Sequence, residues 1–285
     1  MKRSEFRFFD RQRVRWAEVD MQKIVFNGHY LMYFDTAVSG YWRALALPYH
    51  DTMAALGGDL YVRKATLEYL ASARYDDQLA IGMRCSRIGN SSLVFQAAVF
   101  RAEQCLVHGE LVYVFADPAT QTSRPVPQTL REVLNGYEAG EPVLSLQCGP
   151  WQALGEATRQ VRQAVFVEEQ GIAADLVVDA LDEEAVHVLA CNRFGVPVAA
   201  GRLLQPSRGL AQLGRMAALP SLRGAHLGQA VLQRLLQAAR ERGDVAVTLH
   251  AQTGAVGFYE RFGFVAEGPV FETAGIPHRT MRRAL

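Results

Sequence analysis

The segment from residue 28 to residue 47 most constrains the fold, because it is a helical pattern with apolar residues on more than one face. Its apolar side chains recur at intervals of three and four residues, at Tyr30, Leu31, Phe34, Val38, Tyr41, Trp42 and Leu45. A surface helix carries a single apolar stripe, whereas a helix of this kind buries most of its circumference. We therefore predict a long helix wrapped by other structure.

Strand patterns surround this helix in the sequence. One precedes it at residues 6–16, and four follow it, with turn-forming residues between them. The four segments are 60–70, 78–88, 92–102 and 105–117. One strand, one buried helix and a four-strand antiparallel meander make an α+β domain in which the sheet curls around the helix.

The pattern breaks between residues 117 and 150. This stretch begins rich in Pro, Thr and Ser, contains a short helical segment at 129–137 and ends with loop composition, so we interpret it as a linker region. A chain of 285 residues also exceeds the roughly 150 residues of one typical domain. We place the boundary near residue 141, which predicts domains at 1–140 and 141–285.

The second half of the chain alternates helices and strands. A helix is expected at 153–171, a second at 228–242 and a third at 255–263. Strands are expected at 186–193, 196–205, 211–219 and 245–252, followed by a hairpin-like tail. Sheet strands with helices between them predict a mixed α/β layer.

Charge and composition exclude several classes of function. The formal net charge is +1 with both signs interspersed, so there is no basic stripe for nucleic acid. No apolar run approaches the about 20 residues of a membrane-spanning helix, and the N-terminus lacks the apolar core of a signal peptide. The four cysteines, Cys85, Cys105, Cys148 and Cys191, form no CxxC pair. We expect a soluble cytoplasmic protein with free thiols and without a metal site.

The first chemical constellation lies just before the long helix. Asp20 stands a few residues upstream of Asn27 and Gly28, where the helix is expected to begin. A carboxylate can attack a thioester or activate water, and the unpaired N–H groups of a helix start can stabilise an oxyanion. A lone Asp in a turn can equally be a capping residue. His29 is a weaker candidate for the same site.

Residues 17–37 resemble the active-site segment of the YbgC/FadM-type acyl-CoA thioesterases, a branch of the 4-hydroxybenzoyl-CoA thioesterase family. The family pattern falls on Asp20, Ile24–Val25, Asn27 and Tyr30, while Ser72 stands where Pro is usual. The resemblance covers residues 5 to about 138. It implies a hot-dog fold, with Asp20 as the catalytic carboxylate and Asn27, Gly28 and Tyr30 lining the substrate site. It also implies a homo-oligomer, a dimer or a tetramer.

The second constellation runs from Arg223 to Gly228, between an expected strand and an expected helix. Backbone N–H groups at a helix start favour phosphate. This segment resembles the acetyl-CoA-binding motif of the GNAT superfamily, although His226 replaces its middle glycine. Residues 150–285 as a whole resemble the ElaA-like branch, on the run 165–172, the closing 275–278 and the segment around Tyr259.

The GNAT resemblance assigns expected roles. Tyr259 would be the general acid that protonates the departing CoA thiolate, because its phenol stays protonated at neutral pH. The contacts to acetyl-CoA would come from Met216, Ala217, Ala218, Arg223, Gly224, Ala225, His226, Leu227, Gly228 and Gln252. The general base is left open between Glu168, Glu169, His187, His250 and water.

Together these features predict a bifunctional enzyme. The first domain would hydrolyse acyl-CoA, and the second would transfer an acetyl group from acetyl-CoA to an unidentified amine, with no tightly bound cofactor. The alternative is that only the thioesterase is active and that the GNAT domain is a non-catalytic module that binds or senses acyl-CoA or acts as a scaffold.

Overall fold

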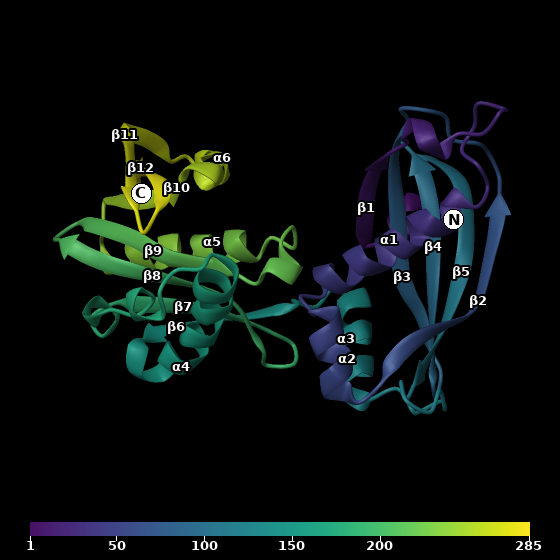
Figure 1. Cartoon of the computed structure of the whole chain (residues 1–285), viewed down its shortest axis with the longest axis horizontal. Helices are drawn as coiled ribbons and strands as arrows, with labels where there is room; N and C mark the ends of the chain where they lie inside the picture. Colours follow the sequence, from purple (N-terminus) through teal and green to yellow (C-terminus); the bar gives the residue numbers. More distant parts are fainter. The chain divides into compact units, whose positions relative to one another are not determined.

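The computed structural model describes residues 1–285, which form two compact units, Met1–Val143 and Leu144–Leu285 (Figure 1). Each unit has its own sheet and its own helices. The predicted combination of an α+β unit followed by a mixed α/β unit is confirmed by this architecture.

The Met1–Val143 unit contains a five-stranded antiparallel sheet in the order β1-β3-β4-β5-β2. Its strands are β1 (Phe8–Arg13), β2 (Asp59–Tyr69), β3 (Gln78–Ile88), β4 (Ser92–Arg101) and β5 (Gln104–Ala116). Its helices are α1 (His29–Ala44), α2 (Tyr49–Leu56) and α3 (Gln128–Glu138). The helix α2 was absent from our expectation, because Pro48 at its start and the short length of its pattern resemble a loop.

Helix α1 lies against one face of this sheet and contacts β1, β3 and β4 (Figure 1). The ring of Tyr41 meets the edges of Phe95 and Tyr137, with centroids 5.4 Å and 5.3 Å apart, so α1 is packed between the sheet and α3. Strand β5 lies close to its partner strand β2 at Gly109, because this residue has no side chain. A Cβ there would lie 2.1 Å from the Thr66 carbonyl oxygen. The prediction of a wrapped helix is confirmed only in part, because Tyr30, Phe34 and Tyr41 are buried whereas an exposed stripe runs along α1 through Leu31, Met32, Asp35, Thr36 and Ser39.

The Leu144–Leu285 unit contains a seven-stranded sheet in the order β11-β12-β10-β9-β8-β7-β6. Its strands are β6 (Leu144–Pro150), β7 (Val186–Asn192), β8 (Pro197–Ser207), β9 (Leu210–Ala218), β10 (Ala246–Gln252), β11 (Val265–Thr273) and β12 (Ile276–Ala284). The β9–β10 pair is parallel and the other pairs are antiparallel. Its helices are α4 (Trp151–Arg162), α5 (Leu227–Arg242) and α6 (Val256–Glu260).

Helices α4 and α5 cover opposite faces of this sheet. A Cβ on Gly201 would meet Val231 and Leu235 of α5, whereas the neighbouring Ala200 is buried in a cluster with Leu154 and Val161 of α4. Successive residues of a strand point to opposite faces, so the two helices lie on different sides.

A β-bulge interrupts β9. From Arg202 to Ala200 strand β8 advances by two residues, while β9 advances by three, from Gly214 to Ala217. The extra residue places Arg215 in the left-handed region with φ 53°, where residues other than glycine are uncommon.

Two expectations for the second unit were incomplete. Residues 144–150, predicted as part of a loop-like linker, form the edge strand β6. The error has a physical reason, because an edge strand needs only one partner and its outer positions can be polar and exposed. The predicted helix at 153–171 is α4 followed by a π-helical segment, Gln163–Glu169.

No helix in the structure is both long enough and apolar enough to cross a membrane. The four cysteines are free thiols.

Candidate active sites

Asp20 lies near the tip of a small hairpin that precedes α1. The base of this hairpin is closed by a hydrogen bond from the Phe26 N–H to the Glu18 carbonyl at 2.9 Å, and Val19 bridges Val25. Nearer the tip the Asp20 N–H donates to the Ile24 carbonyl, and Asp20 Oδ1 accepts from the Gln22 N–H at 2.8 Å. The carboxylate therefore caps a turn through one oxygen, and its second oxygen makes no bond within the chain.

The hairpin is held by a buried carboxylate that our sequence analysis missed. Glu18 is 3% exposed and accepts from the Tyr33 hydroxyl at 2.7 Å and from the Arg15 N–H and Nε at 2.7 Å each. Burial acts to raise the pKa of Glu18, but the hydrogen bonds from Arg15 and Tyr33 outweigh it and lower the pKa below its usual value. Glu18 is therefore an ionised anchor for the hairpin that carries Asp20.

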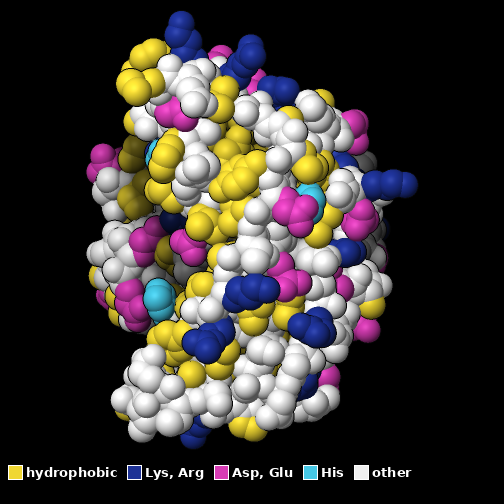
Figure 2. Space-filling model, turned by 90° about the vertical axis from the view of Figure 1, so that its right-hand side faces the viewer, with side chains coloured by type: hydrophobic (Ala, Val, Ile, Leu, Met, Phe, Trp, Pro, Cys, Tyr) yellow, Lys and Arg dark blue, Asp and Glu magenta, His cyan; other side chains and the backbone are white.

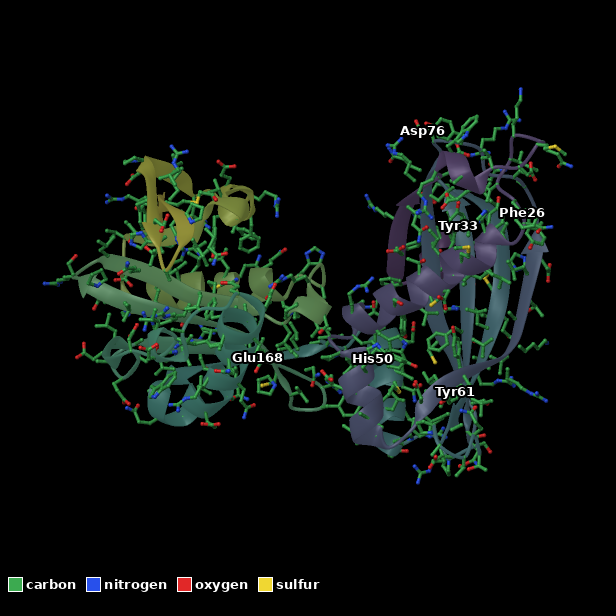
Figure 3. The ribbon with its side chains drawn as sticks, viewed as in Figure 1. Phe26, Tyr33, His50, Tyr61, Asp76 and Glu168 are labelled. Atoms are coloured by element: carbon green, nitrogen blue, oxygen red, sulfur yellow. The ribbon has the colours of Figure 1, made fainter.

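The start of α1 supplies the other predicted residues of this site. The Asn27 carbonyl accepts from the Tyr69 hydroxyl at 3.1 Å, which ties the helix start to the end of β2 close to Phe26 (Figure 3). The N–H groups of Asn27 and Gly28 make no hydrogen bond within the chain, whereas the His29 N–H donates to Phe26. Tyr30 is buried, and its hydroxyl accepts from the Ala73 N–H at 3.0 Å. Two free N–H donors thus remain at the helix start, and Tyr30 is a packing and positioning residue.

In the second unit, strands β9 and β10 separate and leave one edge of β9 open. Their parallel pairing ends at Leu213 and Leu249. Beyond that point β10 continues along β12 and β9 continues along β8, where Ala217 and Ala218 pair with Ala200 and Ala199. The backbone of Met216–Ala218 therefore has a sheet partner on one side only.

A cavity of about 1040 Å³, which we call the first cavity, opens at this separation. Nine of the ten residues predicted to contact acetyl-CoA line it: Met216, Ala217, Ala218, Arg223, Gly224, His226, Leu227, Gly228 and Gln252. Ala225 is the exception, since it is not part of the lining and its N–H donates to the Leu222 carbonyl.

Helix α5 begins at the wall of the first cavity. Its first helical hydrogen bond runs from the Ala230 N–H to the His226 carbonyl, so the amides of Leu227, Gly228 and Gln229 have no carbonyl partner in the helix. His226 precedes them with φ 60°, in the left-handed region that favours glycine. This turn presents free N–H groups at the positive end of the helix dipole, which suits an anion.

A second cavity, of about 630 Å³, lies beside the first and contains Tyr259 in its lining. The two cavities share Gln170, Met216, Gln252 and Ala255. At this junction Gln252 Nε2 donates to Gln170 Oε1 at 3.1 Å. Tyr259 is 8% exposed, and burial raises the pKa of its hydroxyl to about 12. A protonated phenol therefore belongs to the lining of the second cavity.

The structure separates the four candidates for a general base. Glu169 lines the first cavity and forms an ion pair with Arg223, while Glu168 is exposed and lines neither cavity. His187 is fully buried, and its Nε2–H donates to the Asp182 carbonyl at 2.9 Å. His250 lines the second cavity, where burial and the neighbouring His278 lower its pKa. Only His250 combines access to the second cavity with a neutral imidazole at neutral pH.

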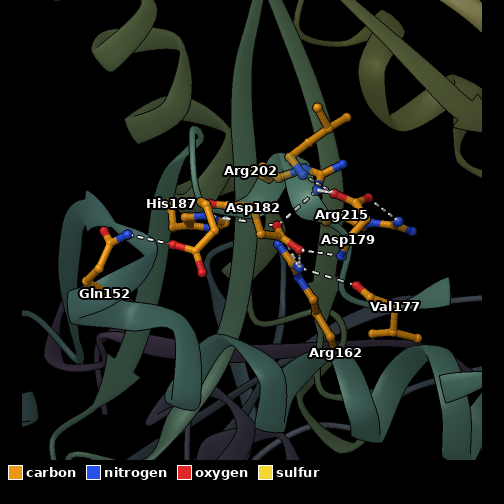
Figure 4. A network of polar contacts seen from close by, with 10 residues as sticks. Gln152, Arg162, Val177, Asp179, Asp182, His187, Arg202 and Arg215 are labelled. Atoms are coloured by element: carbon orange, nitrogen blue, oxygen red, sulfur yellow. Dashed lines mark hydrogen bonds and ion pairs between the residues drawn. The ribbon is translucent and has the colours of Figure 1, made fainter. Parts of the chain in front are cut away.

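A buried ionic network behind the second cavity also escaped our sequence analysis (Figure 4). Asp182 accepts from Arg162 Nη1 at 2.9 Å and from Arg202 Nη1 at 2.9 Å, and it is fully buried. Asp179 accepts from Arg202 at 2.6 Å and from Arg215 at 2.8 Å. Burial acts to raise the pKa of Asp179, but the bonds from Arg202 and Arg215 outweigh it and lower that pKa to about 2. The sequence contains one sign of this network, because Arg202 and Arg215 lie within strands whose neighbouring residues are mostly apolar. A buried charge needs a partner, so these arginines predict acidic residues nearby.

Comparisons with known proteins match each unit separately. Residues 22–107 match the thioesterase superfamily, and residues 156–285 match the acetyltransferase (GNAT) domain. Acyl-CoA thioester hydrolase YbgC of Escherichia coli is 30% identical over 122 residues, which are 41% of this chain and 88% of that protein.

Two relatives match the second unit. The "Uncharacterized N-acetyltransferase YjcF" of Bacillus subtilis is 37% identical over 124 residues, 43% of this chain and 87% of that protein. Protein ElaA of Escherichia coli is 34% identical over 131 residues, 45% of this chain and 85% of that protein. Both resemblances inferred from the sequence are therefore confirmed. The chain belongs to two families at once, with a thioesterase-superfamily domain followed by a GNAT acetyltransferase domain.

Proposed function

We propose that the Leu144–Leu285 unit transfers an acetyl group from acetyl-CoA to an amine. The observation that carries this proposal is that two cavities meet at Gln170, Met216, Gln252 and Ala255. The first cavity offers free amides at a helix start for a pyrophosphate and the open edge of β9 for an amide-containing arm. The second cavity offers a separate space for the acceptor.

The proposed reaction uses two groups that line the second cavity, His250 and Tyr259. The amine nitrogen bonds to the thioester carbonyl carbon, His250 takes a proton from that nitrogen, and the C–S bond breaks as the amide forms. Tyr259 gives its proton to the departing thiolate, because a phenol with a pKa of about 12 is protonated at neutral pH and can donate to a developing anion. The products are an N-acetylated amine and free CoA.

Tyr259→Phe tests this role, because it removes one hydroxyl from an otherwise unchanged ring. We expect kcat for acetyl transfer to fall by about 10²-fold with little change in KM for acetyl-CoA. Unchanged kcat in Tyr259→Phe would remove Tyr259 from the mechanism. Tight binding of acetyl-CoA with no transfer to any amine would instead favour the non-catalytic sensing or scaffolding role.

We infer that the Met1–Val143 unit hydrolyses acyl-CoA thioesters. Asp20 keeps one carboxylate oxygen free, and the free N–H groups of Asn27 and Gly28 can accept the developing oxyanion in hydrogen bonds. A water molecule attacks the carbonyl carbon while Asp20 takes its proton, the C–S bond breaks, and the proton passes to the thiolate. The products are a carboxylic acid and free CoA.

Asp20→Asn tests this assignment by keeping the shape of the side chain and removing its charge. We expect thiol release from acyl-CoA to fall by about 10²-fold or more. The two variants control for each other, because Asp20→Asn should leave acetyl transfer unchanged and Tyr259→Phe should leave thioester hydrolysis unchanged. Full hydrolysis by Asp20→Asn would show that Asp20 only caps its turn.

We propose that the Met1–Val143 unit assembles with a second copy through the edge strand β2. Strand β2 pairs only with β5, and apolar side chains lie along the face that carries β2 (Figure 2), with Val62 and Tyr69 57% and 52% exposed. An exposed edge of this length is a template for strand pairing. Light scattering of the full chain should give a dimer or a larger assembly that Val62→Lys weakens; a monomeric mass would contradict this proposal.

Free thiols are typical of a reducing compartment, so a cytoplasmic location is part of this proposal.

A further inference from the structure

The second cavity has an unusual balance of charge. Its charged or titratable side chains are Arg202, Arg215, His250 and His278 together with the phenol of Tyr259, and no Asp or Glu belongs to its lining. Its remaining wall is mostly apolar, with Leu176, Leu181, Leu204, Leu213 and Ile276 among its members. A cavity of this kind has no counter-charge for a second ammonium group on an acceptor.

The network behind the wall does not neutralise these arginines. Three guanidinium groups, those of Arg162, Arg202 and Arg215, face two carboxylates, those of Asp179 and Asp182. One positive charge is therefore left over. Asp182 is fully buried and belongs to the lining of neither cavity, so it is bound to its arginines and cannot serve a ligand.

Arg215 is the member of the network best able to bind a ligand. Its Nη2 donates to Asp179 Oδ2 at 2.8 Å, its other donors make no bond within the chain, and its side chain is 29% exposed. A guanidinium is a planar fork that suits a carboxylate. Asp179 holds one side of the fork, so the orientation of the other side is fixed before a ligand arrives.

Arg215 lies in the β-bulge, directly before a residue that lines both cavities. Met216, at the junction of the two cavities, is the next residue along β9. Their Cα atoms are thus about 3.8 Å apart, the fixed spacing of a trans peptide. Arg215 and Met216 both line the second cavity, and Met216 also lines the first, so a molecule bound to Arg215 occupies the cavity that adjoins the one proposed for acetyl-CoA.

We propose that the acceptor is a primary amine that carries a carboxylate on an apolar body, and that Arg215 binds this carboxylate. This inference rests on the acetyl transfer proposed above and specifies its substrate class. Arg202 supports the site from behind by holding Asp179, and the leucines and Ile276 contact the apolar body. Polyamines and other acceptors with two positive charges are selected against.

The test uses matched amines with the full-length protein. One series is leucine, leucinamide and 3-methylbutylamine, and the other is 6-aminohexanoate, 6-aminohexanamide and hexylamine, with the triamine spermidine as the polycationic probe. We expect kcat/KM for the carboxylate member of at least one series to exceed that of its amide by about tenfold or more, which corresponds to one charge-assisted hydrogen-bonded contact. Arg215→Gln should abolish this preference and Arg215→Lys should restore part of it, while Arg240→Gln, an exposed arginine on α5, should leave it intact.

Binding of the same amines to the CoA-bound protein, measured by calorimetry, separates the possible failures. Equal or faster acetylation of the amines without a carboxylate, or of spermidine, would overturn the carboxylate inference and leave acetyl transfer in place. Carboxylate-dependent binding without acetylation would support the anion site and overturn the proposed transfer. Neither binding preference nor acetylation would overturn both.

Discussion

Arg223 and Glu169 form a bidentate ion pair, in which the two terminal nitrogens of Arg223 each lie 2.5 Å from one carboxylate oxygen of Glu169. Both residues line the first cavity. A cation expected to meet the pyrophosphate of acetyl-CoA is thus already occupied by a carboxylate. In the proposed binding mode, the pyrophosphate and Glu169 would therefore compete for the same donors of Arg223.

Glu169→Gln should release Arg223 for the substrate. We expect KM for acetyl-CoA to fall by about two- to fivefold, the range of a partly exposed ion pair, while kcat changes little. Steady-state kinetics measures both, with Glu168→Gln as the control because Glu168 lines neither cavity. If kcat instead fell by about two orders of magnitude, Glu169 would be identified as the general base.

The turn before α5 should depend on its backbone and not on the imidazole of His226. Because His226 has φ 60°, His226→Gly fits the same conformation, whereas His226→Pro cannot, since proline fixes φ near about −65°. We expect His226→Gly to keep the affinity for acetyl-CoA within about threefold and His226→Pro to lose about tenfold or more. Calorimetric titration measures both; equal losses would mean that the side chain makes the contact.

The loss of acetyl transfer at low pH should reflect protonation of His250. Burial and His278 lower the pKa of His250, so its neutral form is present above that pKa and is lost as the pH falls through it, below the ordinary value near 6.5. We expect kcat at saturating substrate to decline as the pH falls below about 6.5. His250→Gln should lower kcat by about 10²-fold and remove this limb. An unchanged pH profile in His250→Gln would exclude His250 as the base and leave Glu169 or water.

Tyr33→Phe should destabilise the hairpin of Asp20. It removes the hydroxyl that donates to the buried Glu18 carboxylate at 2.7 Å, a loss of about 1.5–3 kcal/mol in the free energy of unfolding. Since the folded-state pKa of Glu18 is lowered, this contribution is present above the unfolded value near about 4.3 and is lost as the pH falls through the folded-state pKa.

The effect of Tyr33→Phe is measured in urea, where hydrogen exchange of the α1 amides reports unfolding at pH 7 and at pH 3. Tyr75→Phe is the matched control, because Tyr75 is 54% exposed. A deficit of the same size at both pH values would contradict an ionised Glu18.

Asp182→Asn should be among the most destabilising changes in the second unit. Asp182 bonds to Arg162 and Arg202, and removing one partner of a buried ion pair costs about 3–5 kcal/mol because the remaining charges lose their compensation. Hydrogen exchange of β7 and β8 in increasing urea measures the loss, with the exposed Glu184→Gln as control. A loss below about 1 kcal/mol would mean that water replaces the carboxylate.

The features predicted correctly from the sequence are those with a repeated pattern. The apolar repeat from residue 28 onward correctly indicates a long helix packed on the sheet, although Leu31 is exposed, and the meander of β2 to β5 alternates between marked turns. Edge strand β6 escaped prediction because its exposed positions place no demand on hydrophobicity.

The candidate sites were predictable where they lie on a contiguous motif, as in the turn from Arg223 to Gly228. The network of Arg162, Asp182 and Arg202 was not, because its members come from α4, a loop and β8 and meet only in the folded unit. Glu18 was overlooked for the same reason, since its partner Tyr33 lies 15 residues later in the sequence, on α1.

The extra residue in β9 sets which face of the sheet the side chains in each half of that strand point to. Up to Leu213 the strand follows one alternation of faces, and from Ala217 onward it follows the opposite one. Deletion of Gly214 would leave a regular strand that still pairs with β8. Ala217 and Ala218 would keep Ala200 and Ala199 as partners and would keep their faces, but Arg215 would lose the left-handed conformation that the bulge imposes. A shortening by one residue would therefore change the direction of the Arg215 side chain and the wall of the second cavity while leaving the sheet intact.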